Sequence, residues 1–431
     1  MSVLFLLCAA CEACGGGQAE APGTDPGSPP PASPASATDT PEPEPAALPT
    51  NLVDSTPEAQ DAFARGSNRF AFDLFRGRPP GNQVFSPGSI SLALAMTWAG
   101  ARGETAAQLA RPFGFTDSTH AAAAGLLNAY NQEGSPLAVA NRLFGEESFN
   151  LRAEFLALAQ ARYAAPFEGL DFQQDAEGAR EHINTWVAGR THDRIQNLLP
   201  PGAVDETTRL VLVNAAYFLG HWAVPFARAA TRPEVFQTTA TTEVRVPMMN
   251  HRLHARSATV AGARVLELPY EGDRFAMVFV LPEARHGLAA LEGGLDAAQW
   301  ERFMGGLQAG EAVVAIPRFE VKLEPSLSLV ESLRQMGVVH AFDPAQADFS
   351  GMAAPLPNVG PLVVGNVLHQ AFLRVDESGT EAAAATAVAM GDGAGPAAAV
   401  PVFRMDEPFL FALCDRQSGI ILFLGRVTDP S

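Results

Sequence analysis

The chain has 431 residues, 47% hydrophobic and 18% charged, and is therefore long and apolar enough to bury a large core. Its formal net charge of −18 argues against nucleic acid or an anionic membrane surface as its partner. Cys8, Cys11 and Cys14 lie near the N-terminus and Cys414 stands alone in an apolar run, so we expect no disulfide in the folded domain and a buried Cys414. A single lysine, Lys322, and abundant Ala, Gly and Pro indicate a GC-rich bacterial genome.

The N-terminus, "MSVLFLLCAACEACGGG", contains an apolar run too short to span a bilayer as a permanent helix and ends in small residues. Residues 1–14 are therefore predicted to be a leader. "CAAC" resembles the lipobox of bacterial lipoproteins, with Cys11 as the residue that would be lipidated, although Cys8 stands where Leu is usual. An ordinary cleaved signal is the alternative. We expect an exported protein, either secreted or anchored as a lipoprotein at the bacterial cell surface.

Residues 15–57 are rich in Pro, Ala, Gly, Ser, Thr and acidic residues, and they contain no Lys or Arg. Such a composition cannot bury enough apolar surface to offset the entropy of ordering, so we predict a disordered linker. The linker would hold a folded domain, residues 58–431, away from a lipid-bearing cysteine.

The first half of this domain has helical patterns. "AQDAFARGSNRFAFDLFRGR" (59–78) spaces Phe63, Phe70 and Leu74 along one helical face. "VFSPGSISLALAMTWAGARGETAAQLA" (84–110) predicts a short strand followed by one long buried helix, because Ser86 can cap a helix and Pro87 suits its first turn.

Strand patterns dominate the second half. "LVLVNAAYFLGHW" and "FAMVFVLPEA" are apolar runs without helical period, "EAVVAIPRFEVKLEPSLSLVESLRQMGV" predicts strand, turn and helix, and "FLFALCDRQSGIILFLGRV" predicts a hairpin closed at "RQSG". Helices followed by strands favour an α+β domain over an alternating parallel sheet.

The run "DESGTEAAAATAVAMGDGAGPAAAV" (376–400) allows two interpretations. Its alanines favour a helix by local propensity. Its alternate residues, however, are all small or apolar, and they would share one face if the segment were extended, as in a strand that joins a sheet.

Motifs of enzymes are missing from the sequence. There is no HExxH, no Walker loop, no GxSxG and no CxxC pair inside the domain. "HRLH" (251–254) lacks further ligands and is predicted to be a surface feature, and "GDGAGP" (391–396) a flexible loop. We therefore expect neither an enzyme nor a metal or cofactor site.

The chain from about residue 59 to 431 resembles the serpins, a family of serine protease inhibitors. Eight segments carry the resemblance in family order: "VFSPGSI" (84–90), "INTWV" (183–187), "LVNAAYFLGHWAVPF" (212–226), "VPMM" (246–249), "ELPYEGDRFAMVFVLPE" (267–283), "HQAFLRVDESGTEAAAAT" (369–386), "DEPFLFAL" (406–413) and "GRVTDP" (425–430).

The resemblance implies a single large domain with helices packed on three β-sheets and an exposed reactive loop. In this family a protease cleaves the loop, which then inserts into the main sheet and carries the acylated enzyme to the far pole, a known case of strand addition. About sixteen residues at ~3.3 Å each would give a transit on the order of 50 Å. Small alternating side chains suit such insertion, because a buried charge or a proline would oppose it.

The resemblance also assigns roles to residues. The hinge of the loop would comprise Glu377, Gly379, Thr380, Glu381, Ala382, Ala383, Ala384, Ala385 and Thr386, which match the inhibitory form. The region where the sheet opens would contain Trp222, Arg318 and Glu377, and a central polar cluster would contain Ser86, Ser89, Asn184 and His369. The bait would be Met390, Gly391, Asp392, Gly393, Ala394, Gly395, Pro396 and Ala397.

Counting from the hinge places the cleaved bond between Gly393 and Ala394, whereas counting back from Pro408 gives Ala397. No Lys, Arg or aromatic residue lies between Glu377 and Phe403, so we expect an elastase-like or subtilisin-like target and not a trypsin-like one.

Three further expectations concern partners and class. Residues 112–141, where some animal serpins bind glycosaminoglycans, contain no Lys or Arg, which argues against activation by heparin. We expect a monomer. Inhibition of cysteine proteases by the same trap, or a non-inhibitory binding or chaperone-like module, are the alternatives to serine protease inhibition.

Overall fold

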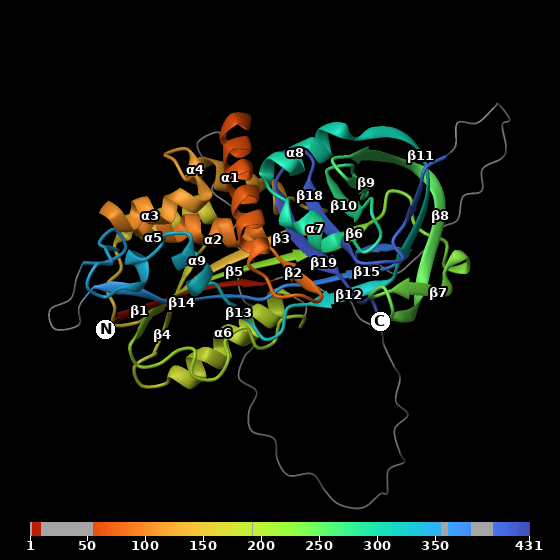
Figure 1. Ribbon diagram of the computed structural model, residues 1–431. Helices are drawn as coiled ribbons and strands as arrows, with labels where there is room; N and C mark the ends of the chain where they lie inside the picture. Colours follow the sequence, from red (N-terminus) through yellow and green to blue (C-terminus); the bar gives the residue numbers. More distant parts are fainter. Residues whose placement is uncertain (1, 10–54, 192, 355–360, 381–399) are drawn as a thin grey trace, which may run out of the picture.

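The computed structural model describes residues 2–9, 55–191, 193–354, 361–380 and 400–431. Helices α1 to α5 cover one face of the main sheet and α6 covers the other, while a second, strongly curved sheet lies beside α1 (Figure 1). Among the described residues the helices are α1 (Pro57–Arg76), α2 (Pro87–Gly100), α3 (Gly103–Phe113), α4 (Thr119–Tyr130), α5 (Ala153–Tyr163), α6 (Ala176–Arg190), α7 (Leu288–Gly293), α8 (Ala297–Gly306) and α9 (Val330–Gln335), with short 3-10 turns at Arg228–Ala230 and His340–Phe342.

The main sheet has the strand order β13-β14-β1-β5-β3-β4. Two short ladders, β12 with β15 and β16 with β6, follow on from its strands toward the second sheet. The bounds are β1 (Ser2–Ala9), β3 (Leu137–Glu146), β4 (Phe167–Leu170), β5 (Thr208–Phe218), β6 (Gly220–His221), β12 (Phe319–Lys322), β13 (Leu327–Ser328), β14 (Leu362–His369), β15 (Phe372–Val375) and β16 (Gly379–Thr380).

The second sheet has the order β17-β11-β8-β9-β10-β18-β19-β2, and β7 pairs with β8. Every residue of β10, β18 and β19 is buried, which explains why these strands appear in the sequence as continuous apolar runs. The bounds are β2 (Gln83–Phe85), β7 (Arg232–Gln237), β8 (Glu243–Val260), β9 (Ala263–Pro269), β10 (Phe275–Pro282), β11 (Gln308–Pro317), β17 (Val402–Arg404), β18 (Phe409–Asp415) and β19 (Ile421–Val427).

The start of α2 agrees with its prediction, but its length does not. The Ser86 hydroxyl accepts a hydrogen bond from the amide of Ser89 at 3.3 Å, and Pro87 occupies the first turn. The single long helix predicted after the short strand, up to residue 110, is wrong, because Ala101 and Arg102 are extended and Gly103 has a φ of +54°. The chain therefore turns there and starts α3 in a new direction.

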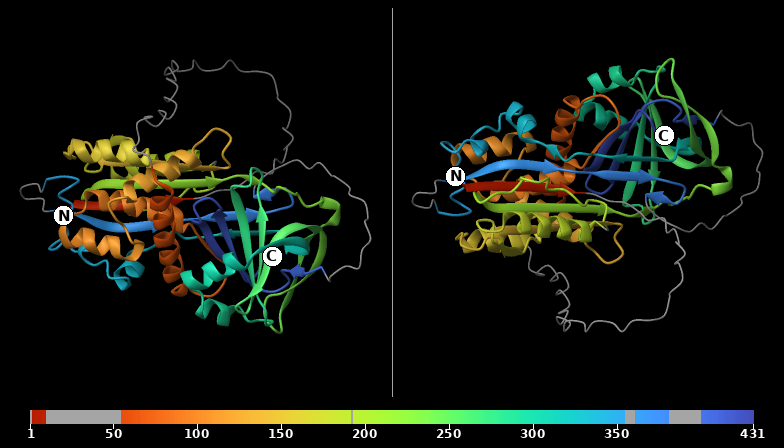
Figure 2. Two further views of the ribbon diagram at one scale, coloured as in Figure 1. Left: turned by 90° about the horizontal axis from the view of Figure 1, so that it is seen from above. Right: turned by 90° about the horizontal axis from the view of Figure 1, so that it is seen from below.

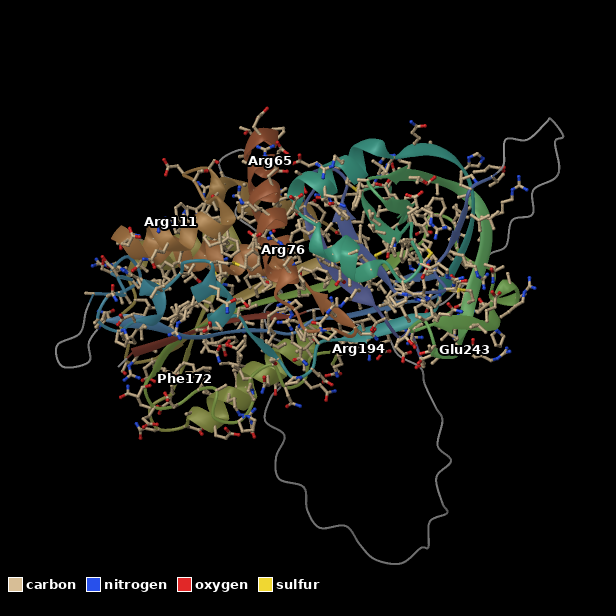
Figure 3. All side chains as sticks on the ribbon, in the orientation of Figure 1. Arg65, Arg76, Arg111, Phe172, Arg194 and Glu243 are labelled. Atoms are coloured by element: carbon tan, nitrogen blue, oxygen red, sulfur yellow. The ribbon has the colours of Figure 1, made fainter. Side chains whose placement is uncertain are left out.

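Two apolar cores hold the domain together. The larger one lies between the helices and both sheets. The smaller one lies between α6 and the main sheet, where Phe172, Ile183 and Val213 are buried together, and Figure 3 labels Phe172 on this side. Cys414 is buried in the larger core, and burial raises the pKa of its thiol well above the usual value, which suits an unreactive core residue. No described helix is long and apolar enough to cross a membrane.

Candidate functional site

A tight turn connects β15 to β16 at the end of the main sheet. The amide of Asp376 donates to the carbonyl of Gly379 at 3.0 Å, and the amide of Gly379 donates back at 3.3 Å. Beyond this turn, Gly379 and Thr380 pair antiparallel with His221 and Gly220 of β6. Since β6 directly follows β5, the chain at Thr380 points back into the main sheet, alongside β5.

Gly379 is required where it stands. Its φ of +150° is rarely adopted by residues with a side chain. A Cβ at this position would lie 2.0 Å from the carbonyl oxygen of Gly220 and 2.8 Å from the Cα of His221. The two backbones can approach this closely only because residue 379 is glycine.

Glu377 anchors the turn. Its carboxylate accepts hydrogen bonds from Arg318 at 2.6 Å and from the hydroxyl of Thr231 at 2.7 Å, and its carbonyl accepts the amide of Phe226 at 2.8 Å. Burial raises the pKa of Glu377, but the hydrogen bonds from Arg318 and Thr231 together lower this pKa by more than burial raises it. The pKa therefore lies below the ordinary glutamate value of 4.5. The carboxylate is therefore charged and held in place at neutral pH.

Trp222 and Tyr270 form the wall against which the turn rests. Their rings stack at a centroid distance of 4.5 Å, and both side chains are buried. The indole N–H of Trp222 donates to the carbonyl of Asp376 at 2.9 Å, and its amide donates to the carbonyl of Ser378 at 2.9 Å. The hydroxyls of Tyr270 and Thr380 lie 2.6 Å apart, within hydrogen-bond distance. We call the group Trp222, Thr231, Tyr270, Arg318, Glu377 and Thr380 the hinge latch.

A line of hydrogen bonds runs under the main sheet. The amide of Ser86 donates to Nε2 of His369 at 3.0 Å, which requires a neutral imidazole with its proton on Nδ1. On the next turn of α2 the Ser89 hydroxyl donates to the side chain of Asn214 on β5. Asn214 donates to Asn141 of β3 at 2.6 Å. This central polar network, Ser86, Ser89, Asn141, Asn214 and His369, connects β14 to β5 and β3 through the start of α2.

Asn184 was expected in this cluster, but the structure places it on the opposite side of the sheet. Its side chain donates to the carbonyl of Leu199 at 2.9 Å and accepts the amide of the same residue at 2.8 Å. The reason is that Asn184 belongs to α6, which packs on the face of β5 that carries Val211 and Val213, whereas Asn214 lies on the face of Leu210, Leu212 and α2.

The first residues of the loop point into the main sheet and are held by the ion pair between buried Glu377 and half-exposed Arg318. The polar network joins strands β14, β5 and β3 of the same sheet. A sequence model of the family described as "Serpin (serine protease inhibitor)" matches residues 65–430. The chain belongs to the serpin family. The match begins within α1 and ends after β19.

Several serpins resemble the chain over their full length. Human leukocyte elastase inhibitor is 38% identical over 391 residues, which cover 86% of this chain and all of that protein. Serpin B6 of Pongo abelii is 38% identical over 385 residues with the same coverage. Among solved structures, a cleaved serpin 42Da has a TM-score of 0.76 and 31% identity, and uncleaved ovalbumin has a TM-score of 0.75 and 28% identity; they match 86% and 85% of this chain and all of their own chains.

The structure describes only part of the predicted site residues of this serpin. Trp222, Arg318 and Glu377 meet in the hinge latch, and Gly379 and Thr380 begin the predicted hinge. Hinge residues 381–386, the bait at 390–397 with the bond proposed at Gly393–Ala394, and Cys11 lie outside the described residues. No cluster of metal-binding side chains occurs in the described part of the chain.

Sequence reasoning missed Tyr270, Thr231, Asn141 and Asn214. Tyr270 lies within "ELPYEGD" and Asn214 within "LVNAAYF", two segments that carried the resemblance, but no role was assigned to them. The alternation of residues along β5 could have indicated Asn214, because a polar residue in an apolar strand that is buried on both faces needs a partner.

Proposed function

We propose that this serpin inhibits serine proteases as a suicide substrate. A protease attacks the reactive loop, and the cleaved loop enters the main sheet as a new strand before the acyl-enzyme is hydrolysed. The observation that carries this proposal is the direction of β16, which already runs antiparallel to β6 and toward β5 at Thr380.

The register of β16 defines a path for the loop. Continued without a bulge, the pairing of Gly379 with His221 and Thr380 with Gly220 would place residues 382–392 opposite β5, from Phe218 back to Thr208. Eleven residues at ~3.3 Å span roughly 36 Å. Residues 382–392 contain one charged residue, Asp392, at the far end, so nearly the whole segment can enter a buried sheet without burying a charge.

The target is proposed to be an elastase-like or subtilisin-like enzyme. Residues 390–400 offer Ala, Gly, Val and Met to a specificity pocket, and no Lys or Arg that a trypsin-like pocket requires. The relative named leukocyte elastase inhibitor supports the same class of target.

The test is to mix the chain without its predicted leader, beginning at Cys11, with pancreatic elastase, with subtilisin and with trypsin, and to look for a covalent complex that survives SDS and boiling. Elastase or subtilisin should form such a complex and release a C-terminal peptide whose N-terminal residue lies between 391 and 401. Papain in the same assay tests the cysteine protease alternative. Cleavage by all three serine enzymes without a complex would contradict inhibition, and a complex with trypsin through this loop would contradict the proposed specificity.

For the N-terminus we propose export followed by lipidation at Cys11, which would anchor the inhibitor at the bacterial cell surface. The lipobox-like "CAAC" and the linker-like composition of residues 15–57 support this proposal. The wild-type protein should partition with membranes, and Cys11→Ser should remain in the soluble fraction. Equal solubility of the two proteins would favour a plain secretion signal. Gel filtration tests the expected monomer.

A further inference from the structure

The first strand of the chain occupies the centre of the main sheet. β1 pairs in parallel with β14 on one side, from Ser2 with Leu362 to Cys8 with His369. On its other side it pairs in parallel with β5, from Val3 with Thr208 to Ala9 with Ala215. Figure 2 shows β1 in red between β14 in blue and β5 in green when the molecule is seen from below.

This position is the one that the cleaved loop needs. The path proposed above places residues 382–392 opposite the edge of β5 between Phe218 and Thr208. β1 already pairs with that edge from Thr208 to Ala215. Only the edge from Ala216 to Phe218 is left for the loop, which is room for residues 382–384. A strand has one hydrogen-bonding edge on each side, so β1 and the loop cannot both pair with β5.

The two strands also differ in direction. β1 runs parallel to β5 and β14, whereas β16 enters antiparallel to β6. The loop therefore cannot extend β1 or share its ladder, and it can enter fully only after β1 has left both neighbours.

We infer that β1 acts as an internal plug, which keeps the unprocessed chain in a non-inhibitory form until residues 2–9 are removed or displaced. The inference rests on the proposed function, since the plug blocks loop insertion. The sequence of β1, "SVLFLLCA", has no charge, proline or glycine and is rich in residues that strands favour or tolerate. Because β1 belongs to the same chain, dilution does not release it.

Leader removal and activation are then the same event. Hydrolysis of the peptide bond before Cys11, in which one water is added across the bond, releases residues 1–10 and with them all of β1. The inhibitor would become active only after it has left the compartment in which it was made.

The test compares the full chain with a variant that lacks residues 2–9, each incubated with pancreatic elastase. We expect the full chain to be cleaved in its loop with little SDS-stable complex. The shortened chain should form the complex readily, with at least tenfold fewer inhibitor molecules consumed per enzyme trapped. Two substitutions in the full chain refine the comparison. Leu6→Pro removes a backbone N–H from the ladder and should restore part of the inhibition, whereas Leu6→Ala keeps this N–H and should behave as the wild-type chain.

A second readout does not depend on inhibition. Hydrogen exchange at the amides of β5 and β14 should be slow in the full chain and faster in the shortened chain, and the full chain should unfold at a higher temperature. Equal complex formation by the two chains, or equal exchange in β5 and β14, would overturn the plug. If neither chain forms a complex while exchange differs as expected, the failure lies with the proposed function and with the regulatory role built on it, and the pairing of β1 stands.

Discussion

Replacing Gly379 with alanine tests whether the turn before β16 starts loop insertion. The added Cβ would meet the carbonyl oxygen of Gly220 at 2.0 Å, and both groups belong to backbones that cannot rotate away. A residue forced into such a conformation costs about 1–3 kcal/mol, and each lost ladder bond costs about 1 kcal/mol. The native chain can relieve this clash by unpairing Gly379 from His221.

Insertion of the loop, however, requires residue 379 to pair with His221 again. The free-energy cost of the clash is therefore added to the barrier for insertion. A cost on the order of 3 kcal/mol slows insertion by about 100-fold, while hydrolysis of the acyl-enzyme is unchanged. The variant should therefore be consumed mainly as a substrate by elastase, which titration of enzyme activity measures as the number of inhibitor molecules used per enzyme trapped. The shortened chain without residues 2–9 is the proper background.

Gly310→Ala is the matched control for this variant. Gly310 lies in strand β11, and a Cβ there has no atom within 4 Å. The Gly310→Ala substitution should leave the number of inhibitor molecules used per enzyme trapped unchanged. A Gly379→Ala protein that traps elastase as efficiently as Gly310→Ala would refute the role of this turn.

Four other substitutions and one control give independent tests. In the chain without residues 2–9, Thr380→Arg buries an unpaired charge and Ala384→Pro removes a ladder bond on the insertion path. Each should reduce complex formation at least tenfold while cleavage continues, and retained trapping in both would contradict insertion. Burial lowers the pKa of His120 to about 4, so the unfolded chain binds a proton that the folded chain does not as the pH falls from about 6.5 toward 4. The free energy of unfolding from urea titrations should fall between pH 7 and pH 5, and His120→Gln should reduce this fall whereas exposed His254→Gln should not. The lowered pKa of Glu377 contributes stability above pH ~4.5 that is lost below it, so wild-type stability should approach that of Glu377→Gln as the pH falls, and a constant difference from pH 7 to pH 3 would argue against the charged latch.

Local patterns predicted the elements whose residues determine their own structure. Ser86 and Pro87 indicated the start of α2, and the turn at "RQSG" joins β18 to β19 as expected. The break after Gly100 was missed because the residues that follow also suit a helix, whereas in the structure Ala101 and Arg102 are extended and Gly103 has a left-handed φ. Propensity does not reveal such a turn, since glycine is tolerated inside many helices.

The candidate site shows a second limit. Asn184 and Asn214 each lie among apolar residues, and residue type alone does not say which of them joins Ser89. The answer depends on the face of the sheet against which α6 packs, which is a tertiary property. The same holds for residues 2–9, because a short uncharged apolar run suits both a leader and a buried strand, and its partners β5 and β14 lie more than 200 residues away.

The two sides of the main sheet differ in mechanical stiffness. On one side, β5 pairs with β3 along its length, from Leu137 to Gly145, and Asn214 ties it to Asn141. On the other side, β14 has an outer neighbour, β13, that contributes only two paired residues. A force that moves β5 and β14 apart should therefore displace β14, which is weakly held on its outer side, while β5 stays fixed. Differences in trapping speed between relatives should then follow substitutions in β13, in β14 and in the turn at His340–Phe342 near β14, more than substitutions in β3 or β5.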